Sequence, residues 1–241
     1  MKSVLFVIAA RGGSKGVPRK NIKKIGELPL IAYKINAAKK VGMDKRIIVS
    51  TDDDEIAEVA LSYGAEVPFI RPQELSTDTA SSVDVVEHAL KWVLENDDKV
   101  YDYVCLLEPS SPFATSNDLE KALELIISRD ADTLLGMKEV EVSSKYIHQL
   151  DSNGGLSKFF DVIQNMKSVR RQDQEKEYTM NGCMYIAKID YFLKNKSFHS
   201  EKSLPYIMPP EKSIEIDSMS DYMYACFLVK EGFINIQDWS L

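Results

Sequence analysis

Basic side chains and glycines are concentrated in one short stretch near the start of the chain, "ARGGSKGVPRKN" at residues 10–21. It contains three glycines, the hydroxyl of Ser14 and four cations, Arg11, Lys15, Arg19 and Lys20. Glycines let backbone N–H groups approach phosphate oxygens closely, and cations neutralise the phosphate charge. The stretch matches neither G-x-x-x-x-G-K-[ST] nor G-x-G-x-x-G. It therefore predicts a phosphate site of another kind, with an ordinary basic turn as the alternative.

Two acidic residues near the other end of the chain, Glu215 and Asp217 in "EIDSMSD", stand two positions apart. If this segment is a strand, both carboxylates project from the same face. Like charges on one face repel each other unless a cation lies between them. Mg²⁺, which binds few carboxylates and shares phosphate oxygens, is the natural candidate. The alternative is a solvated strand edge followed by a helix cap.

A third motif, "LLEPSSPF", ends an apolar run with a carboxylate followed by two prolines. Pro109 and Pro112 stop any helix and keep the chain extended. Such a turn can present Glu108, Ser110 and Ser111 to a ligand, although a purely structural turn is the alternative. The histidines are isolated from one another and no G-x-S-x-G occurs, so we expect no histidine-based catalysis.

Composition excludes several classes of protein. The formal net charge of −7 argues against a general nucleic-acid binder. No apolar run is long enough to span a bilayer, and "SVLFVIAA" lacks a signal-peptide cleavage pattern, so we expect a protein that is not inserted in a membrane. The three unclustered cysteines favour a cytoplasmic location.

The elements that must position these motifs alternate regularly between strand and helix. Apolar strand-like segments at 3–10, 44–53, 66–72, 101–113 and 131–140 are separated by amphipathic helical segments at 29–43, 53–65, 81–96 and 116–130. This order predicts an α/β fold with a doubly wound, mostly parallel sheet. The polar strand tips "AARGGSKG", "VSTDDD" and "LLEPSSP" then meet at one sheet edge, where ligands bind in such folds.

Towards the C-terminus we expect strand and helix at 178–193 and at 213–232, with Ser218 or Ser220 as the cap of the last helix. Ser116 or Asn117 is the expected cap of the helix over 116–130. The stretch at about 139–177 breaks the alternation. We interpret residues 1–241 as one domain in which this stretch is an inserted lid or partner-facing subregion.

The motifs together resemble the N-acylneuraminate cytidylyltransferase (CMP-sialic acid synthetase) family, including the legionaminic and pseudaminic acid cytidylyltransferases. The similarity covers essentially the whole chain through "ARGGSKGVPRKN", "STDDDEIAEVALSYGAEVPFIRP", "LLEPSSPF", "MNGCMYI" and "IEIDSMSDY". It implies a Rossmann-like nucleotidyltransferase fold with a small dimerisation arm, and a homodimer. It also implies the reaction: CMP passes from CTP to the anomeric hydroxyl of a nine-carbon 2-keto sugar acid, with release of pyrophosphate and a requirement for Mg²⁺.

The resemblance also implies roles for individual residues. CTP would be held by Arg11, Gly12, Gly13, Ser14, Lys15, Lys20 and Asn21, with Arg71 and Ser81 or Ser82 near its base. The sugar acid would meet Glu108, Asn181, Tyr185 and Arg171, the last through the sugar carboxylate. Arg11, Lys20 and Asp217 would be catalytic, and Glu215 and Asp217 would bind the metal ion.

Two departures from the family pattern concern the sugar. Glu108 stands where a glutamine is common, and the acidic pair is Glu-x-Asp in place of Asp-x-Asp. A carboxylate accepts hydrogen bonds but does not donate them unless protonated, so the groups it faces on the sugar can differ. Sialic, legionaminic, pseudaminic and eight-carbon Kdo acids all remain candidates. A non-catalytic nucleotide-binding protein of the same fold is the alternative from another class.

Overall fold

A six-stranded sheet forms the centre of the protein, whose computed structural model describes residues 2–164 and 175–240. The strand order is β4-β1-β5-β7-β6-β8, and β7 alone runs antiparallel to its neighbours in this sheet. The predicted α/β fold with a mostly parallel sheet is thereby confirmed. The strands are β1 Ser3–Ala9, β4 Asp44–Ser50, β5 Tyr103–Leu107, β6 Thr133–Glu139, β7 Tyr178–Lys188 and β8 Ser203–Ile207.

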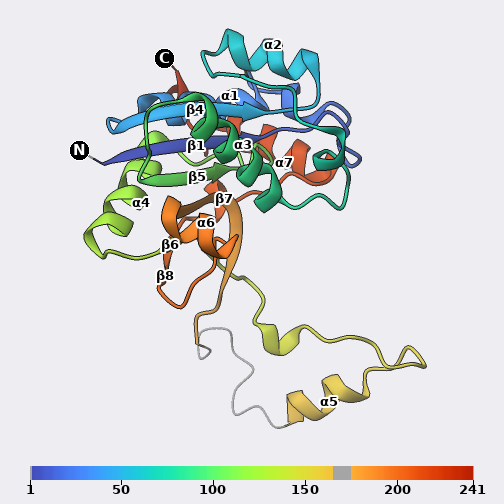
Figure 1. Cartoon of the computed structure of the whole chain (residues 1–241). Helices are drawn as coiled ribbons and strands as arrows, with labels where there is room; N and C mark the ends of the chain where they lie inside the picture. The colour runs from blue at the N-terminus through green and yellow to red at the C-terminus, as the bar shows by residue number, and fades with distance from the viewer. Residues whose placement is uncertain (1, 165–174, 241) are drawn as a thin grey trace.

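Helices cover both faces of this sheet (Figure 1). They are α1 Leu30–Lys40, α2 Asp54–Ser62, α3 Ser82–Asn96, α4 Ser116–Ser128, α5 Ser157–Gln164, α6 Ile189–Asn195 and α7 Met219–Lys230. Short 3-10 turns lie at η1 Lys20–Ile22, η2 Gln73–Leu75, η3 Ser144–Tyr146, η5 Pro210–Lys212 and η6 Ile236–Trp239. A two-stranded ribbon pairs β2 Lys24–Ile25 with β3 Leu28–Pro29.

Strand β1 shows why the sheet is buried on both faces. Val4, Phe6 and Ile8 belong to the hydrophobic core formed with α1, α2, α4 and α7. Leu5 and Val7 belong to the second core, formed with α3 and α6. Because successive side chains point to opposite faces, a continuous apolar run serves two cores at once.

Several sequence predictions about local structure are wrong. Residues 66–72 form only isolated bridges, Ile48 with Glu66 and Thr51 with Ile70, because Pro68 and Pro72 have no N–H to donate. The segment 213–217 is not a strand. It is attached by single contacts such as the Ile216 N–H to the Ser110 carbonyl (2.8 Å).

The sequence analysis also missed the edge strand β8, which contains Pro205 and so lacks the usual strand signal. The cap of α4 is Thr115, which forms a capping box with Asp118, and not Ser116 or Asn117. Ser218 caps α7, as predicted.

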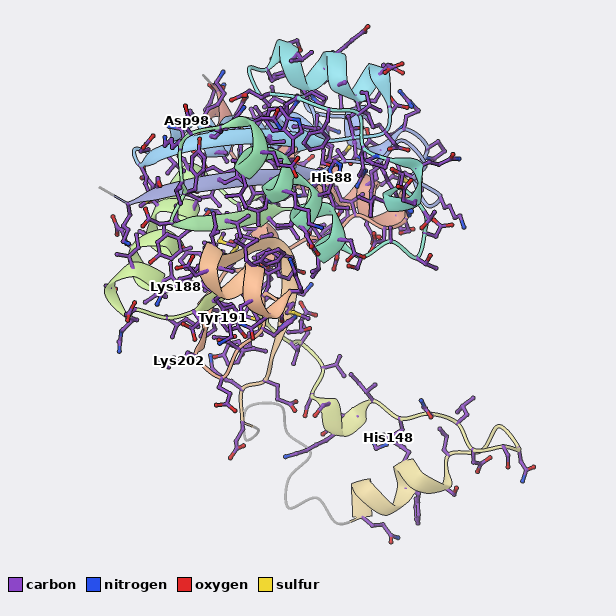
Figure 2. All side chains as sticks on the ribbon, in the orientation of Figure 1. His88, Asp98, His148, Lys188, Tyr191 and Lys202 are labelled. Atoms are coloured by element: carbon purple, nitrogen blue, oxygen red, sulfur yellow. The ribbon has the colours of Figure 1, made fainter. Side chains whose placement is uncertain are left out.

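Residues 140–164, which follow β6, leave the body of the protein as an extended arm that carries η3 and α5 (Figure 1). Its base is closed by the Val140 N–H, which donates to the Glu177 carbonyl (2.9 Å). Figure 2 shows His148 on this arm and His88 on the body, so these two histidines are far apart. Within the described residues, no helix combines the length and apolarity needed to cross a bilayer.

Candidate active site

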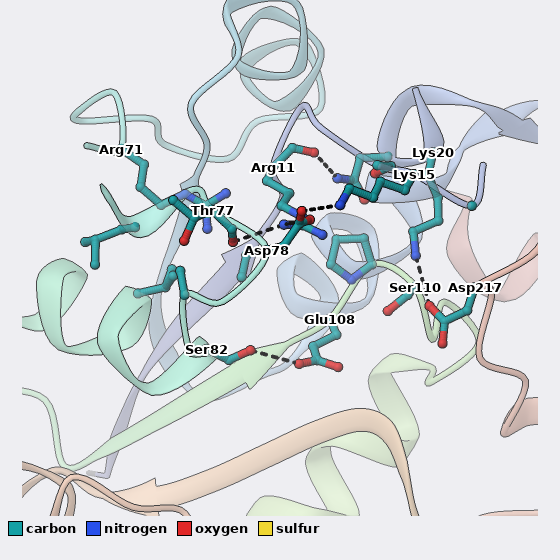
Figure 3. Close-up of a pocket in the computed structure, with 18 of the residues that line it drawn as sticks. Arg11, Lys15, Lys20, Arg71, Thr77, Asp78, Ser82, Glu108, Ser110 and Asp217 are labelled. Atoms are coloured by element: carbon teal, nitrogen blue, oxygen red, sulfur yellow. Dashed lines mark hydrogen bonds and ion pairs between the residues drawn. The ribbon is translucent and has the colours of Figure 1, made fainter. Parts of the chain in front are cut away.

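A cleft of about 390 Å³ opens where β1 and β5 end (Figure 3). Arg11 follows β1 and Glu108 follows β5. Because the carboxyl ends of parallel strands meet at the same sheet edge, both residues lie at this cleft. The predicted residues that line the cleft are Arg11, Ser14, Lys15, Lys20, Asn21, Arg71, Ser82, Glu108, Glu215 and Asp217. Lys20 and Asp217, from opposite ends of the sequence, line this one cleft.

One carboxylate, that of Asp78, sits among the cations of this cleft. Arg11 Nη1 lies 3.0 Å from Asp78 Oδ1 and also donates to the Thr77 carbonyl (3.0 Å). Lys15 Nζ pairs with the other oxygen of Asp78. The hydrogen bond from Lys15 holds the pKa of Asp78 below its usual value. The sequence analysis missed Asp78, because an acid in the loop "STDTA" carries no signal of its distant partners.

Replacing Asp78 with asparagine is expected to tighten binding of CTP, the nucleotide that the resemblance implies, about two- to tenfold. The substitution frees Arg11 and Lys15 from exposed ion pairs and removes a charge that would repel phosphates. Isothermal titration of CTP measures the change. Asp190→Asn on α6 removes the same charge far from the cleft and serves as the control. Equal or weaker CTP binding by the Asp78 variant would contradict the expected competition between this carboxylate and the phosphates for Arg11 and Lys15.

Lys20 lies on the side of the cleft that Asp217 lines. The backbone of Arg19 is left-handed (φ 54°), which turns the chain into η1. Lys20 Nζ then donates to the Ile216 carbonyl (2.6 Å) and lies 3.4 Å from Asp217 Oδ1. Arg19 itself points elsewhere and pairs with Asp53 at the start of α2.

Two further contacts fix the basic loop. Asn21 Nδ2 donates to the Arg11 carbonyl (2.8 Å), and the Gly12 N–H donates to Asp52 Oδ1 (2.9 Å). A Cβ built on Gly16 would lie 1.8 Å from the Asp217 carbonyl oxygen, so only glycine allows this approach. Gly12 and Gly13 are not among the residues that line the cleft.

Arg71 provides donors without partners. Its side chain is almost fully buried, and Nε and Nη2 have no hydrogen-bond partner among the described residues. The nearest carboxylate oxygen, Asp52 Oδ1, is 3.6 Å from Nη2, and burial lowers the pKa of the guanidinium. Buried donors of this kind are costly unless a ligand satisfies them. Because Arg71 lines the cleft, its free donors favour a polar ligand there.

The two candidate nucleotide-binding serines, Ser81 and Ser82, have different positions relative to the cleft. Ser81 accepts from the Asp84 N–H (3.2 Å) as the cap of α3, and it does not line the cleft. Ser82, the next residue, lines the cleft and donates to Glu108 Oε1 (3.2 Å). Burial raises the pKa of Glu108, although the bond from Ser82 opposes this shift.

The acidic side of the cleft brings Glu108 close to Glu215. A Cβ built on Gly182 would lie 3.3 Å from Glu108 Oε2 and 3.3 Å from Glu215 Oε1. Burial, followed by the charge of Asp217, raises the pKa of Glu215. The expected strand geometry for the acidic pair is wrong, and the two carboxylates reach the cleft from an irregular segment.

A second hollow of about 240 Å³ adjoins the cleft, and Ser82 and Glu108 line both. Tyr185, predicted near the sugar, lies in this hollow with Leu106, Met180, Phe198 and His199. Asn181, also predicted near the sugar, is fully buried and lines neither cavity. Arg171 lies outside the described residues.

Comparison with known proteins places these features in a family. The sequence model of the cytidylyltransferase family matches residues 5–220. Pseudaminic acid cytidylyltransferase of Campylobacter jejuni is 36% identical over 226 residues, which cover 94% of this chain and 96% of that protein. CMP-N,N'-diacetyllegionaminic acid synthase of Legionella pneumophila is 34% identical over 220 residues, covering 91% and 93%.

N-acylneuraminate cytidylyltransferase of Escherichia coli is 35% identical over 223 residues, which cover 92% of this chain and 51% of that protein. Among solved structures, a CMP:2-keto-3-deoxy-manno-octonic acid synthetase complexed with CTP matches with a TM-score of 0.67. The match covers 96% of this chain and 100% of that one at 15% identity, and so it speaks for the fold alone. On the sequence matches over nearly its whole length, this chain belongs to the cytidylyltransferase family and is a nucleotidyltransferase.

Proposed function

We propose that this protein transfers CMP from CTP to the anomeric hydroxyl of a nine-carbon 2-keto sugar acid and releases pyrophosphate. The observation that carries the proposal is one cleft in which Arg11, Lys15 and Lys20 lie with the carboxylates of Glu215 and Asp217. The relatives named for pseudaminic, legionaminic and N-acylneuraminic acid are nearly equally similar, so we assign the class of sugar acid and not one member.

The residues of the cleft suit an in-line displacement at the α-phosphorus of CTP. Arg11 and Lys15, once released from Asp78, would hold the leaving phosphates. Lys20 would donate to the α-phosphoryl oxygens, where charge accumulates in the transition state. The free donors of Arg71 would meet the carbonyl oxygen of cytosine. The incoming hydroxyl would be held at the Glu108 end, in line with the leaving pyrophosphate.

We further propose Mg²⁺ as the metal ion, held by Glu215 and Asp217. Among the described residues, no three His, Cys, Asp or Glu side chains form a group that could hold a metal ion. Two carboxylates that line a phosphate-sized cleft fit Mg²⁺, which takes one or two protein carboxylates together with substrate phosphates. When bound, the ion supplies charge neutralisation at the phosphate oxygens.

The hollow around Tyr185 and Phe198 is the proposed sugar subsite, since it opens onto the cleft at Glu108. Its apolar wall of Leu106 and Met180 suits the methyl groups of N-acyl substituents. We also propose that the protein is a homodimer in which the arm contacts the partner. Exposed apolar side chains on the arm, Ile147, Leu150, Leu156 and Phe160, support this.

A pyrophosphate-release assay with CTP tests the proposal directly. The acceptor panel is N-acetylneuraminic, N,N'-diacetyllegionaminic, pseudaminic and Kdo acid. Release with any of the three nine-carbon acids supports the proposal and identifies the acceptor. Release with Kdo alone would reassign the sugar to the eight-carbon class. CTP binding without release for any acid would favour the non-catalytic alternative.

Glu108→Gln is expected to change the pH profile for the sugar acid. Because burial raises the pKa of Glu108, the carboxylate becomes protonated at a higher pH than an ordinary glutamate as the pH falls. If the ionised carboxylate accepts hydrogen bonds from the sugar, kcat/KM for the sugar should fall as the pH is lowered. The fall should begin at a pH above the range in which an ordinary glutamate titrates. Glutamine should abolish this decline and lower kcat/KM about tenfold at neutral pH. The same acid-side decline in the variant would exclude Glu108 as its cause.

A further inference from the structure

Lys34 on α1 is a lysine with no exposed surface. Burying an ammonium group is costly, and burial lowers the pKa of Lys34. No carboxylate in the described part of the chain lies within ion-pair distance of its Nζ atom. The one hydrogen bond that Nζ makes there goes to the Cys183 carbonyl (2.8 Å). A leucine or methionine would fill this place at lower cost, so the bond to Cys183 needs an explanation.

Strand β7 is irregular at this position. Its pairing with β6 shifts register between Leu135 and Met137, which leaves a bulge around Gly182 and Cys183. Side chains replace the missing ladder partners. Lys34 donates to the Cys183 carbonyl, and Asn181 Oδ1 accepts from the Cys183 N–H (3.1 Å).

This bulge faces the acidic side of the cleft. Gly182 has φ 67°, and a Cβ built on it would lie 2.5 Å from Ser111 Oγ and 3.3 Å from both Glu108 Oε2 and Glu215 Oε1. Asn181 extends the network, because its Nδ2 also donates to Ser213 Oγ (3.0 Å), two residues before Glu215. The predicted sugar contact Asn181 therefore belongs to the buried support of the site.

We propose that Lys34 is a positioning residue: through its hydrogen bond to the Cys183 carbonyl it holds the β7 bulge that supports Glu108 and Glu215. The inference rests on the proposed function and adds to it a residue that touches no substrate. A displacement of about 1 Å at reacting groups can cost about a hundredfold in rate, so loss of this support should affect the sugar step. The CTP cradle of Arg11, Lys15 and Arg71 makes no bond to β7 and should be spared.

The test compares Lys34→Met, which removes the donor, with Lys34→Gln, which keeps an N–H donor without the charge. We expect Lys34→Met to lower kcat/KM for the preferred sugar acid at least tenfold, with the Kd of CTP within twofold of wild type. Lys34→Gln should recover kcat/KM to within about threefold of wild type. Hydrogen exchange of the peptide over 180–187, without substrates, should be faster in the methionine variant.

The matched control is Asn36→Leu. Asn36 is a buried polar residue on the same helix, and its Nδ2 donates to the Trp239 carbonyl (2.8 Å), away from β7. This variant should lower Tm without a change in kcat/KM for the sugar. Should Lys34→Met not fold, Ser213→Ala interrupts the same network at its other end and should lower kcat/KM for the sugar at least threefold.

Wild-type sugar kinetics and hydrogen exchange in Lys34→Met would overturn the inference, as would wild-type kinetics in Ser213→Ala if the methionine variant does not fold. Parallel losses in CTP affinity and sugar kinetics would also overturn it, because they indicate a general structural role. Absence of turnover by the wild-type protein with every acid counts against the proposed function. In that case hydrogen exchange still decides whether Lys34 holds the bulge.

Discussion

Lys20→Ala should lower the rate of pyrophosphate release about a hundredfold or more, with CTP and sugar acid both saturating. Lys20 is the cation of the cleft nearest the acidic segment, and its Nζ lies 2.6 Å from the Ile216 carbonyl and 3.4 Å from Asp217. Alanine removes the donor that we assign to the α-phosphoryl oxygens, where additional negative charge accumulates in the transition state. The rate should therefore fall much more than the affinity for CTP.

Stability should change little in this variant. The hydrogen bond to Ile216 is worth about 1 kcal/mol net, which corresponds to a Tm decrease of about 2–4 °C. Lys24→Ala, at the exposed residue of strand β2, removes the same charge outside the cleft and should keep wild-type turnover. If Lys20→Ala kept more than a third of the wild-type rate, its assignment to the α-phosphate would be wrong.

Asp217→Asn should raise the Mg²⁺ concentration needed for half-maximal activity about tenfold or more, and lower the maximal rate. An amide keeps the shape of the side chain but loses the charge that a hard divalent cation prefers. The Asp217 side chain is 73% exposed and its ion pair with Lys20 is long, so Tm should stay within about 2 °C of wild type. Titration of Mg²⁺ at fixed CTP measures the shift.

The control for this variant is Asp98→Asn, an exposed aspartate on the body of the protein, labelled in Figure 2, which should leave the titration unchanged. An unchanged titration in Asp217→Asn itself would remove this residue from the metal site. Glu215→Gln would then be the next variant to titrate, because Glu215 lines the same cleft.

Much of the site follows from local sequence. The basic loop and the turn after β5 come directly after apolar strands, so parallel pairing brings Arg11 and Glu108 to the same edge of the sheet. The acidic pair illustrates a partial success. Glu215 and Asp217 were predicted from spacing on a strand, and both line the cleft although no strand exists there. The two carboxylates reach the cleft because of the path of the irregular segment that carries them, and not because they alternate along a strand.

Other features of the site could not be predicted, because they are contacts between residues that lie far apart in the sequence and whose local patterns give no sign of the partner. Asp78 pairs with Arg11 and Lys15 only because the loop before α3 folds over the tip of β1. Asn181 is a polar residue of a type that often contacts ligands, yet the β7 bulge places its side chain in the interior. Periodicity reports which face of an element is apolar, but it does not report register shifts or the partners of single polar groups.

The sequence by itself determined that the chain is a mostly parallel α/β protein with a phosphate-suited basic loop, since these properties depend on neighbouring residues and on the period of each element. Only the tertiary structure decided that Asp78 pairs with Arg11 and Lys15 of this loop and that Gly182 lies next to both Glu108 and Glu215. It alone decided that Lys34 supports the bulge beneath them. These contacts arise between segments far apart in the chain, and their geometry is set by how the strands pair and where one of them slips in register.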